Sequence, residues 1–350
     1  MAPLARELSN VDIARRRVVY QRLVGEPFES PLDAVGQLGA VQAQDYAGAK
    51  WALAQRTPAT SDAAIERLVA NGDIVRTHVL RPTWHFVLPA DVRWMLALTG
   101  PRIAASLAHN NRNLELDAKI FRRATEAMAR ALEQEKHLTR PEIAKVLTRA
   151  RIDASNGVRV GFLLMRAELD AVICSGARRG KQITYALLDE RVPGAAPIDR
   201  DEALARLAAR YFATRAPATV QDFAWWSGLT VSDARRGAEA AGPQADVART
   251  KPTRSVHLLP NYDELFIGYR DRRAALDRLV GESRLQGSAA VFGNVIEIDG
   301  QLVGGWRRIA KGKSIAVETT YFTSVTAAER KEVDAQVARY KAFLGNRPDE

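Results

Sequence analysis

The sequence predicts a mainly helical α+β fold, and three observations support it. Helix-capping residues followed by apolar residues at helical spacing recur from Asn10 to about Ala241. Twice in this region the helices lead into short segments rich in β-branched and aromatic residues, as a β-hairpin requires. From about Arg254 strand-like segments predominate, and one more helix follows them. A chain of 350 residues has room for roughly two to four modules of this kind.

The first module is expected to contain three helices and a hairpin. Asn10 caps the first helix, Pro31 opens the second and Ser61 caps the third. Residues 74–88 are rich in Val, Thr, Trp and Phe, and Arg81-Pro82 divides them into two strands. Three helices followed by a hairpin form the layout of a winged helix, in which the hairpin is the wing.

A second copy of this layout is expected further along the chain. Thr139 and Glu142 form a capping box that opens a helix. Another helix is expected over residues 158–172, and the basic, glycine-containing turn at 176–182 leads into a strand. The order is again helix, helix, wing.

A third copy is shorter. Thr219 caps a helix, Gly228 lies in the following turn, and another helix is expected over 231–241. Unrelated helical bundles would give a similar pattern. We expect three tandem winged-helix modules with a C-terminal β-rich subdomain and a terminal helix. The expected boundaries are 1–100, 101–195, 196–252 and 253–350.

The C-terminal part is expected to contain a β-meander over residues 291–322. Its first turn, Asp299-Gly300, is a strong hairpin signal. Its second turn, residues 307–313, is strongly basic. The last helix is expected over 327–344, with apolar residues along one side that pack on the rest of the protein.

The charge of the chain favours a polyanionic partner. It carries 51 Lys and Arg residues against 41 Asp and Glu, which gives a net charge of +10. DNA, RNA or an acidic membrane would suit this balance. A membrane is disfavoured because no long basic amphipathic stretch is present. An arginine-rich proteome would give the same composition, so charge alone leaves the question open.

Cysteine and histidine usage gives a further set of expectations. Cys174 is the single cysteine and lies in an apolar run, so we expect a buried thiol and a reducing compartment. The five histidines have no zinc spacing, and we expect no metal and no cofactor. No signal peptide and no stretch of about 18 apolar residues is recognisable. We expect a cytoplasmic monomer that stays out of the membrane and needs no obligate protein partner.

Gln42 and Gln44 form the most informative motif. In a helix, side chains at positions i and i+2 point about 200° apart, whereas in an extended segment they share a face. Gly39 is placed to end the preceding helix, and helical character resumes around Ala47. The two amides are therefore expected on a connector between helices, aimed at one point.

Two neutral amides can hold a water molecule and orient its lone pair, because each offers donors and an acceptor. They are weak bases, so such a water attacks only where the leaving group departs easily. An N-alkylated purine carries positive charge, and its glycosidic bond breaks through an oxocarbenium-like state that positioning and carbonyl oxygens favour. The alternative is structural, with both glutamines serving as polar connector residues at a helix end.

Several segments resemble the AlkZ/YcaQ-type winged-helix DNA glycosylases. They are Gln42–Gln44, Arg76–His85, Leu259–Glu264, Gly268–Arg272 and Asp299–Arg307. The resemblance implies three tandem winged helices around a concave face that binds double-stranded DNA. It also implies excision of bulky or crosslinking N-alkylpurines, in which Gln44 holds the attacking water and Gln42 helps to stabilise the cationic sugar.

Basic residues on the three expected hairpins are candidates for DNA contact. The candidates are Arg76, Arg81 and His85 on the first wing, Arg178, Arg179 and Lys181 on the second, and Arg307, Arg308, Lys311 and Lys313 on the C-terminal hairpin. Each of these turns also fits a solvated hairpin tip. His85 and Trp84 equally fit a supporting role inside the wing, and the pair Trp225-Trp226 can stack on bases or pack in a core. Residues 262–264 make a poor metal site.

Two functions remain open at this point. One is a monofunctional DNA glycosylase that hydrolyses the N-glycosidic bond without a lysine nucleophile. The other is a non-catalytic DNA-binding protein, regulatory or protective, in which the same basic turns bind DNA and the glutamines are structural.

Overall fold

The computed structural model describes residues 8–192, 194, 196–242, 254–279, 292–311 and 314–345. Helices dominate these residues, and two three-stranded sheets and one four-stranded sheet accompany them, all antiparallel. This agrees with the mainly helical α+β fold that the sequence predicts. No helix in the described part is both long and apolar enough to cross a bilayer.

The N-terminal part forms helices around a sheet with the strand order β1-β3-β2. Its elements are α1 (Asn10–Tyr20), α2 (Pro31–Leu38), β1 (Val41–Gln42), α3 (Tyr46–Ala54), α4 (Asp62–Asn71), β2 (Val75–His78), β3 (Trp84–Val87), α5 (Pro89–Ser106) and α6 (Ala108–Asn113). The expected cap of the first helix was wrong by one residue, because the Ser9 hydroxyl accepts from the Asp12 N–H in a capping box. The hairpin and its break at Arg81-Pro82 are confirmed.

The next part repeats helices with a small sheet, here in the order β4-β6-β5. Its elements are α7 (Ala118–Leu132), β4 (Leu138–Thr139), α8 (Arg140–Arg149), α9 (Gly157–Leu169), β5 (Ile173–Ser175), β6 (Thr184–Leu187) and α10 (Leu188–Arg191). The capping box of Thr139 and Glu142 opens α8 as expected. Cys174 is buried, and burial raises the pKa of its thiol to about 12.

The third part is helical. It consists of α11 (Arg200–Arg215), α12 (Val220–Ser227) and α13 (Val231–Ala241). Thr219 caps α12 and Gly228 ends it with a left-handed φ of 70°, as the sequence predicts. No strand accompanies these helices within residues 196–242.

The C-terminal part contains a four-stranded sheet in the order β10-β9-β8-β7. Its elements are β7 (Val256–Leu259), α14 (Glu264–Ile267), 3-10 turns at Arg273–Ala275 and Asp277–Leu279, β8 (Val295–Ile298), β9 (Gln301–Lys311), β10 (Ser314–Tyr321) and α15 (Ala327–Leu344). The expected turn at Asp299-Gly300 is confirmed, with φ of 53° and 79°. A Cβ on Gly300 would lie 2.5 Å from the Ala14 carbonyl carbon, so this turn packs directly on α1.

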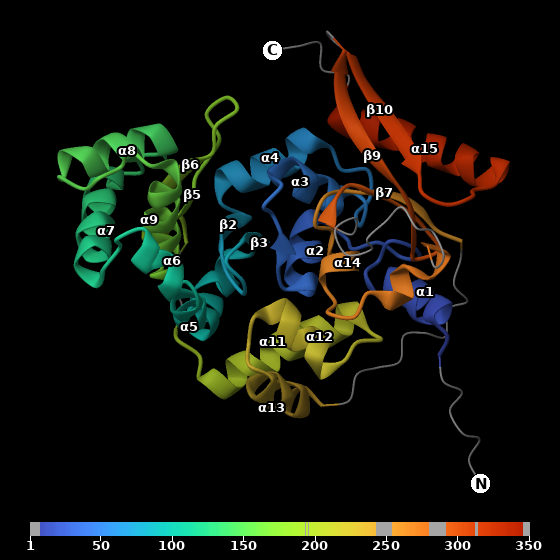
Figure 1. The fold of residues 1–350 in the computed structure, drawn as a ribbon, viewed down its shortest axis with the longest axis horizontal. Coiled ribbons are helices and arrows are strands. Elements are labelled where there is room, and N and C mark those ends of the chain that lie inside the picture. The colour runs from blue at the N-terminus through green and yellow to red at the C-terminus, as the bar shows by residue number, and fades with distance from the viewer. Residues whose placement is uncertain are drawn as a thin grey trace.

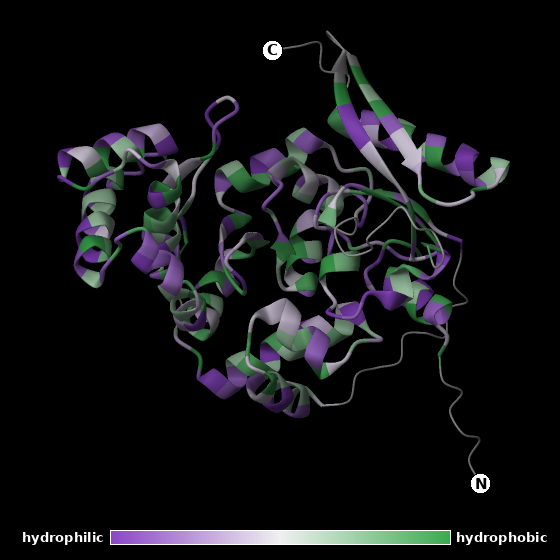
Figure 2. Ribbon diagram, viewed as in Figure 1, coloured by the Kyte–Doolittle hydropathy of each residue, from purple (hydrophilic) through white to green (hydrophobic). Residues whose placement is uncertain are grey.

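Two hydrophobic cores meet around the connector between α2 and α3. One core joins the β1-β3-β2 sheet to α5 and α11–α13 and includes Ala40, Tyr211 and Trp226. The other joins α2, α3, the C-terminal sheet and α15 and includes Val41 and Ala43. Figure 1 shows α2 and α3 at the centre of the molecule, between the green α7–α9 group and the red β9–β10 hairpin. Figure 2 shows hydrophobic residues gathered there, whereas the loop between β5 and β6 is largely hydrophilic.

Candidate active site

The two glutamines lie on a connector between helices, as predicted. Gly39 ends α2 with a φ of 80°, and the Asp45 side chain caps α3 by accepting from the Gly48 N–H at 3.0 Å. Gln44 is exposed, whereas Gln42 is 5% exposed. The Oε1 of Gln42 accepts from the Gln44 N–H at 3.0 Å. The buried amide therefore holds the backbone of the exposed one.

A buried carboxylate fixes the backbone of Gln42 from the other side. Glu264, the first residue of α14, accepts from the Gln42 N–H through Oε1 at 3.0 Å. Its Oε2 accepts from Arg215 Nη2 at 2.8 Å and from Trp226 Nε1 at 2.9 Å. All four residues are buried. The connector is thus tied to α11, α12 and α14.

The neighbouring carboxylate in this segment, that of Asp263, also has hydrogen-bond partners. Asp263 accepts two hydrogen bonds from the buried Arg56 guanidinium, at 2.7 and 2.9 Å. Tyr262 precedes these carboxylates with a φ of 61°. No group of three His, Cys, Asp or Glu side chains in the described part of the chain is placed to hold a metal.

Arg76 supports the middle of the motif. Its Nε donates to the Ala43 carbonyl at 3.0 Å, and its Nη1 donates to Ser175 Oγ at 3.3 Å. Its guanidinium lies 4.4 Å from the Trp84 ring centroid, and Arg76 as a whole is only 5% exposed. This burial argues against the expected contact between Arg76 and DNA and favours a structural role, linking the connector to β5.

His85 occupies an equally buried position. Its exposed fraction is 0%, and its Nδ1 lies 2.9 Å from the Thr83 carbonyl. Burial and the nearby Arg81 charge hold the pKa of His85 well below its usual range, so the ring is neutral. A neutral, enclosed imidazole does not fit the expected contact with DNA. It fits the supporting alternative, since His85 pairs with Gln42 across β3 and β1.

Arg81 has a different environment. Its Nε and Nη2 are buried and have no hydrogen-bond partner among the described residues. The preceding Leu80 has a φ of 63°, and a Cβ on Gly228 would lie 2.2 Å from the Leu80 carbonyl oxygen. Burial lowers the pKa of Arg81, the Glu264 charge opposes this effect, and the Arg272 charge adds to it. Arg81 is therefore a fixed cation close to the carboxylate that holds Gln42.

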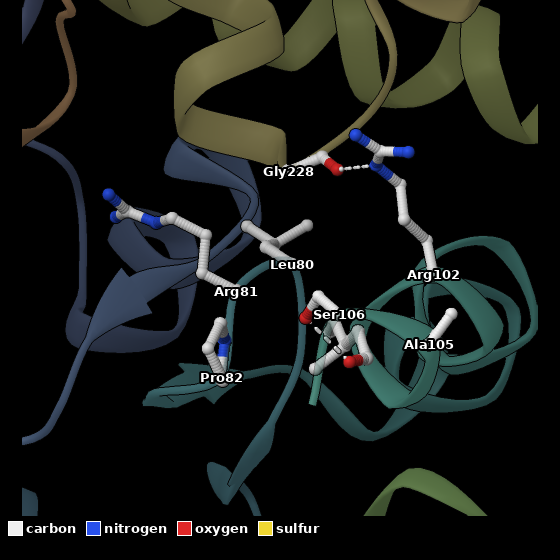
Figure 3. Close-up of a pocket in the computed structure, with 8 residues that line it drawn as sticks. Leu80, Arg81, Pro82, Arg102, Ala105, Ser106 and Gly228 are labelled. Carbon is white, nitrogen blue, oxygen red and sulfur yellow. Dashed lines mark hydrogen bonds between the residues drawn. The ribbon is translucent and has the colours of Figure 1, made fainter. Parts of the chain in front are cut away.

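A pocket of about 440 Å³ lies beside Arg81, between the β2–β3 turn, α5 and Gly228. Figure 3 shows Arg102 donating to the Gly228 carbonyl at the rim of this pocket, at 2.8 Å. The Arg81 guanidinium turns away from the pocket in the same view. The pocket is thus separate from the side of the turn to which Arg81 directs its charge.

The second wing reaches the start of α3. Arg178 Nη1 lies 3.2 Å from Glu66 Oε2, and its guanidinium lies 5.5 Å from the Tyr46 ring centroid. Arg179 pairs with Glu142 at 2.7 Å on the exposed surface, and Lys181 is exposed. Of these three basic residues, Arg178 lies beside Tyr46, which follows Gln44 by two residues.

The C-terminal hairpin carries the remaining candidates. Arg307 is exposed and pairs with Glu318 at 2.6 Å. Arg308 is also exposed, and its hydrogen bond and charge oppose the burial that raises the pKa of Tyr340. Lys311 ends β9, and its side chain lies outside what the structure describes. Lys313 lies outside the described residues.

A polar cluster that was not predicted from the sequence lies beneath the second wing. Tyr46 donates to Glu66 at 2.9 Å, and the buried Lys50 donates to Glu66 at 2.7 Å and lies 2.8 Å from Asp62. Burial and the Glu66 charge raise the pKa of Tyr46. Tyr46 and Lys50 are four residues apart on α3, as are Asp62 and Glu66 on α4, and this spacing is the local signal that each pair shares a helix face.

The site thus combines basic residues on two hairpins with a glutamine pair on a connector that hydrogen bonds tie to the surrounding helices. A profile described as "DNA glycosylase AlkZ-like" matches residues 35–343. The chain therefore belongs to the AlkZ-like DNA glycosylase family.

Two comparisons with individual proteins agree with this membership. An "Interstrand DNA cross-link repair glycosylase" of Streptomyces sahachiroi is 26% identical over 319 residues, covering 82% of this chain and 85% of that protein. The solved structure of Streptomyces sahachiroi DNA glycosylase AlkZ superimposes with a TM-score of 0.74 at 23% identity, covering 97% of this chain and 98% of the other. The second comparison establishes the shared fold.

Proposed function

We propose that this protein is a monofunctional DNA glycosylase that hydrolyses the N-glycosidic bond of N-alkylated purines in double-stranded DNA. The observation that carries the proposal is the exposed Gln44 amide on a backbone that Gln42 and Glu264 hold rigidly. Family membership supports the reaction class. No cofactor is needed for this hydrolysis.

In the proposed reaction Gln44 holds a water molecule through its side-chain amide. The water oxygen forms a bond to C1′ of the sugar while the bond from C1′ to the base nitrogen breaks. The electron pair leaves with the alkylated base, whose positive charge it neutralises, and the water gives up a proton to solvent. Positioning of this kind suits a substrate with a good leaving group, because an amide is a weak base.

Gln42 contributes in two ways. Its carbonyl oxygen orients the Gln44 backbone at 3.0 Å. The same carbonyl carries a partial negative charge, which favours the cationic sugar that develops when the bond breaks. The products are the free base and an abasic site, and no lysine takes part.

The basic hairpins are proposed to bind the phosphates of the duplex. Figure 1 shows the β5–β6 loop and the β9–β10 hairpin projecting from the same edge of the molecule. Arg178, Arg179 and Lys181 lie on the first, and Arg307 and Arg308 lie on the second. Lys311 and Lys313 follow in the sequence and are included in the proposal as further phosphate contacts. Arg81, whose guanidinium has two unpartnered nitrogen atoms, would contact a phosphate nearer the glutamines.

The module organisation is part of the proposal. Residues 1–100 and 101–195 each combine helices with a three-stranded sheet, which is the composition of a winged helix. Residues 196–252 would form the third module and 253–350 the β-rich subdomain. Because the Streptomyces sahachiroi relative is described as a crosslink repair glycosylase, bulky and crosslinking adducts are included among the proposed substrates.

A second function is favoured by one observation, the burial of Gln42. A glutamine that fixes a connector is also what a non-catalytic, regulatory or protective DNA-binding protein would contain. The two functions predict the same binding of DNA. They differ in whether a base is released.

The test uses duplex DNA that carries one 7-alkylguanine. The wild-type protein should generate abasic sites, and Gln44→Ala should generate almost none while binding the duplex equally well. Gln37→Ala is the matched control, because Gln37 is an exposed glutamine on the neighbouring α2. Binding without base release by the wild type would favour the second function.

A further inference from the structure

One tryptophan of the third helical part is exposed. Trp225 on α12 is 41% exposed, whereas its neighbour Trp226 is fully buried and donates to Glu264. Trp51, Trp94 and Trp306 are each at most 7% exposed. A flat partner that covered this exposed indole surface would gain free energy by removing it from water.

Trp225 is the first member of a row of aromatic and cationic groups. The Arg272 guanidinium lies 5.3 Å from the Trp225 ring centroid and 5.0 Å from that of Phe292. The Phe292 and Tyr262 ring centroids are 6.3 Å apart. We call these four residues the Trp225–Tyr262 row. Its planar groups follow one another at distances typical of stacking and cation–π contacts.

Arg272 is only partly satisfied within the row. Its Nε donates to the Phe266 carbonyl at 3.0 Å, which fixes the plane of the guanidinium. Its Nη2 is buried and has no hydrogen-bond partner among the described residues. Arg81, also unpartnered at two nitrogen atoms, is close enough for the two charges to repel. The row therefore combines a partly exposed indole with a guanidinium that has one nitrogen atom without a hydrogen-bond partner among the described residues.

The row ends beside the glutamine connector. Asn261, next to Tyr262, donates through Nδ2 to Asp45 Oδ2 at 3.3 Å, and Asp45 follows Gln44. At the other end Trp226, next to Trp225, shares Glu264 with the Gln42 N–H. Figure 1 shows α12 next to the orange segment that contains α14.

We propose that the Trp225–Tyr262 row is a binding site for a nucleotide of the substrate strand adjacent to the target, with its base stacked on Trp225 and its phosphate near Arg272. Every nucleobase has a flat face that stacks on an indole, and the phosphate supplies the acceptor that Arg272 and Arg81 lack. The inference rests on the proposed function for the position of the target nucleotide.

The test places 2-aminopurine next to a 7-alkylguanine in duplex DNA and follows its fluorescence on binding. The wild type should change this fluorescence, and Trp225→Leu should abolish the change and weaken binding about tenfold, in line with the loss of one stacked base. Trp225→Phe keeps an aromatic face and should retain most of both effects. Val231→Ala is the control, since Val231 is 43% exposed on the adjacent α13 and lies outside the row.

Arg272 provides the second arm. Arg272→Gln should lower the slope of log Kd against log salt concentration by about one, whereas Trp225→Leu should leave that slope unchanged. Shielding of tryptophan from acrylamide quenching should increase when DNA binds the wild type, and this increase should be lost in Trp225→Phe. The quenching measurement therefore does not depend on Trp225→Leu, in which the aromatic ring is missing.

The proposal is overturned if Trp225→Leu binds DNA and perturbs 2-aminopurine as the wild type does, or if Trp225→Phe is as defective as Trp225→Leu. Failure of the proposed function is distinguishable. A wild type that releases no base but loses its 2-aminopurine response in Trp225→Leu would leave the stacking site standing and refute the glycosylase. If the wild type releases base and all Trp225 variants bind DNA alike, the glycosylase stands and the stacking site is refuted.

Discussion

Removing the Glu264 carboxylate should both destabilise the protein and slow base release. Glu264 is 1% exposed and accepts three hydrogen bonds, from the Gln42 N–H, Arg215 and the Trp226 indole. Arg215 is 0% exposed. Glu264→Ala would therefore leave a buried guanidinium without its counter-ion, which costs about 3–5 kcal/mol of unfolding free energy.

Glu264→Gln removes the charge of this side chain and keeps its size and shape. Its amide oxygen can still accept from the Gln42 N–H, but its amide NH2 then faces the Arg215 Nη2 and Trp226 Nε1 donors, so both of these hydrogen bonds lose their acceptor. Because the buried Arg215 guanidinium again loses its counter-ion, a loss of unfolding free energy similar to that of Glu264→Ala, about 3–5 kcal/mol, is expected. Base release should fall less in Glu264→Gln than in Glu264→Ala, because only the glutamine side chain can still accept a hydrogen bond from the Gln42 N–H.

The assay is urea denaturation of both variants and the wild type, followed by single-turnover base release under conditions where each is folded. Glu329→Gln serves as the control for removal of a carboxylate. Glu329 lies on α15, far along the chain from the connector, and pairs with Arg278. Equal denaturation midpoints for wild type and Glu264→Ala would refute the reasoning, as would unchanged base release in that variant.

Three further predictions follow from single buried groups. The folded pKa of His85 lies below its unfolded value, so the unfolded state binds more protons. The stability that this group contributes should be complete above about pH 6.5 and should fall below that pH by up to about 1.4 kcal/mol per pH unit. Since the pKa of His137 is lowered too, His85→Gln should reduce this slope in a denaturation series, whereas His109→Gln at an exposed histidine should leave it unchanged. Arg81→Met should raise the unfolding free energy by about 1–2 kcal/mol, because it removes a guanidinium with two buried nitrogen atoms that lack a hydrogen-bond partner among the described residues. It should also weaken DNA binding in fluorescence anisotropy, and a weaker fold or unchanged binding would contradict this reasoning. Cys174, whose pKa burial raises to about 12, should resist iodoacetamide in the native protein and react only in urea, and rapid native alkylation detected by mass spectrometry would show that the thiol is accessible.

Local signals predicted much of the fold. The bounds of α15, the capping box that opens α8 and the turn at Asp299-Gly300 all agree with the structure. Each is decided by residues within a few positions of one another, through side-chain caps or a left-handed backbone conformation. The two-residue strands β1 and β4 were not expected, because they exist only through pairing with β3 and β6.

The glutamine connector of the candidate site could be predicted from the sequence, but the hydrogen bonds that hold this connector in place could not. The expectation of a connector for Gln42 and Gln44 came from local helix signals and is confirmed. The hydrogen bond from the Gln42 N–H to Glu264 joins residues 222 positions apart, and no local pattern encodes it. Burial of Arg76 and His85 likewise depends on packing between distant elements, so basic residues on an expected wing gave the wrong impression of exposure.

The central claim is that the exposed Gln44 amide orients the water that attacks the sugar. The most direct measurement is the single-turnover rate of 7-alkylguanine release by Gln44→Ala, with the dissociation constant for the same duplex measured alongside. We expect a rate at least about a hundredfold below wild type and an unchanged dissociation constant, because Gln44→Ala removes the group that positions the nucleophile. A rate equal to that of the wild type would contradict the account.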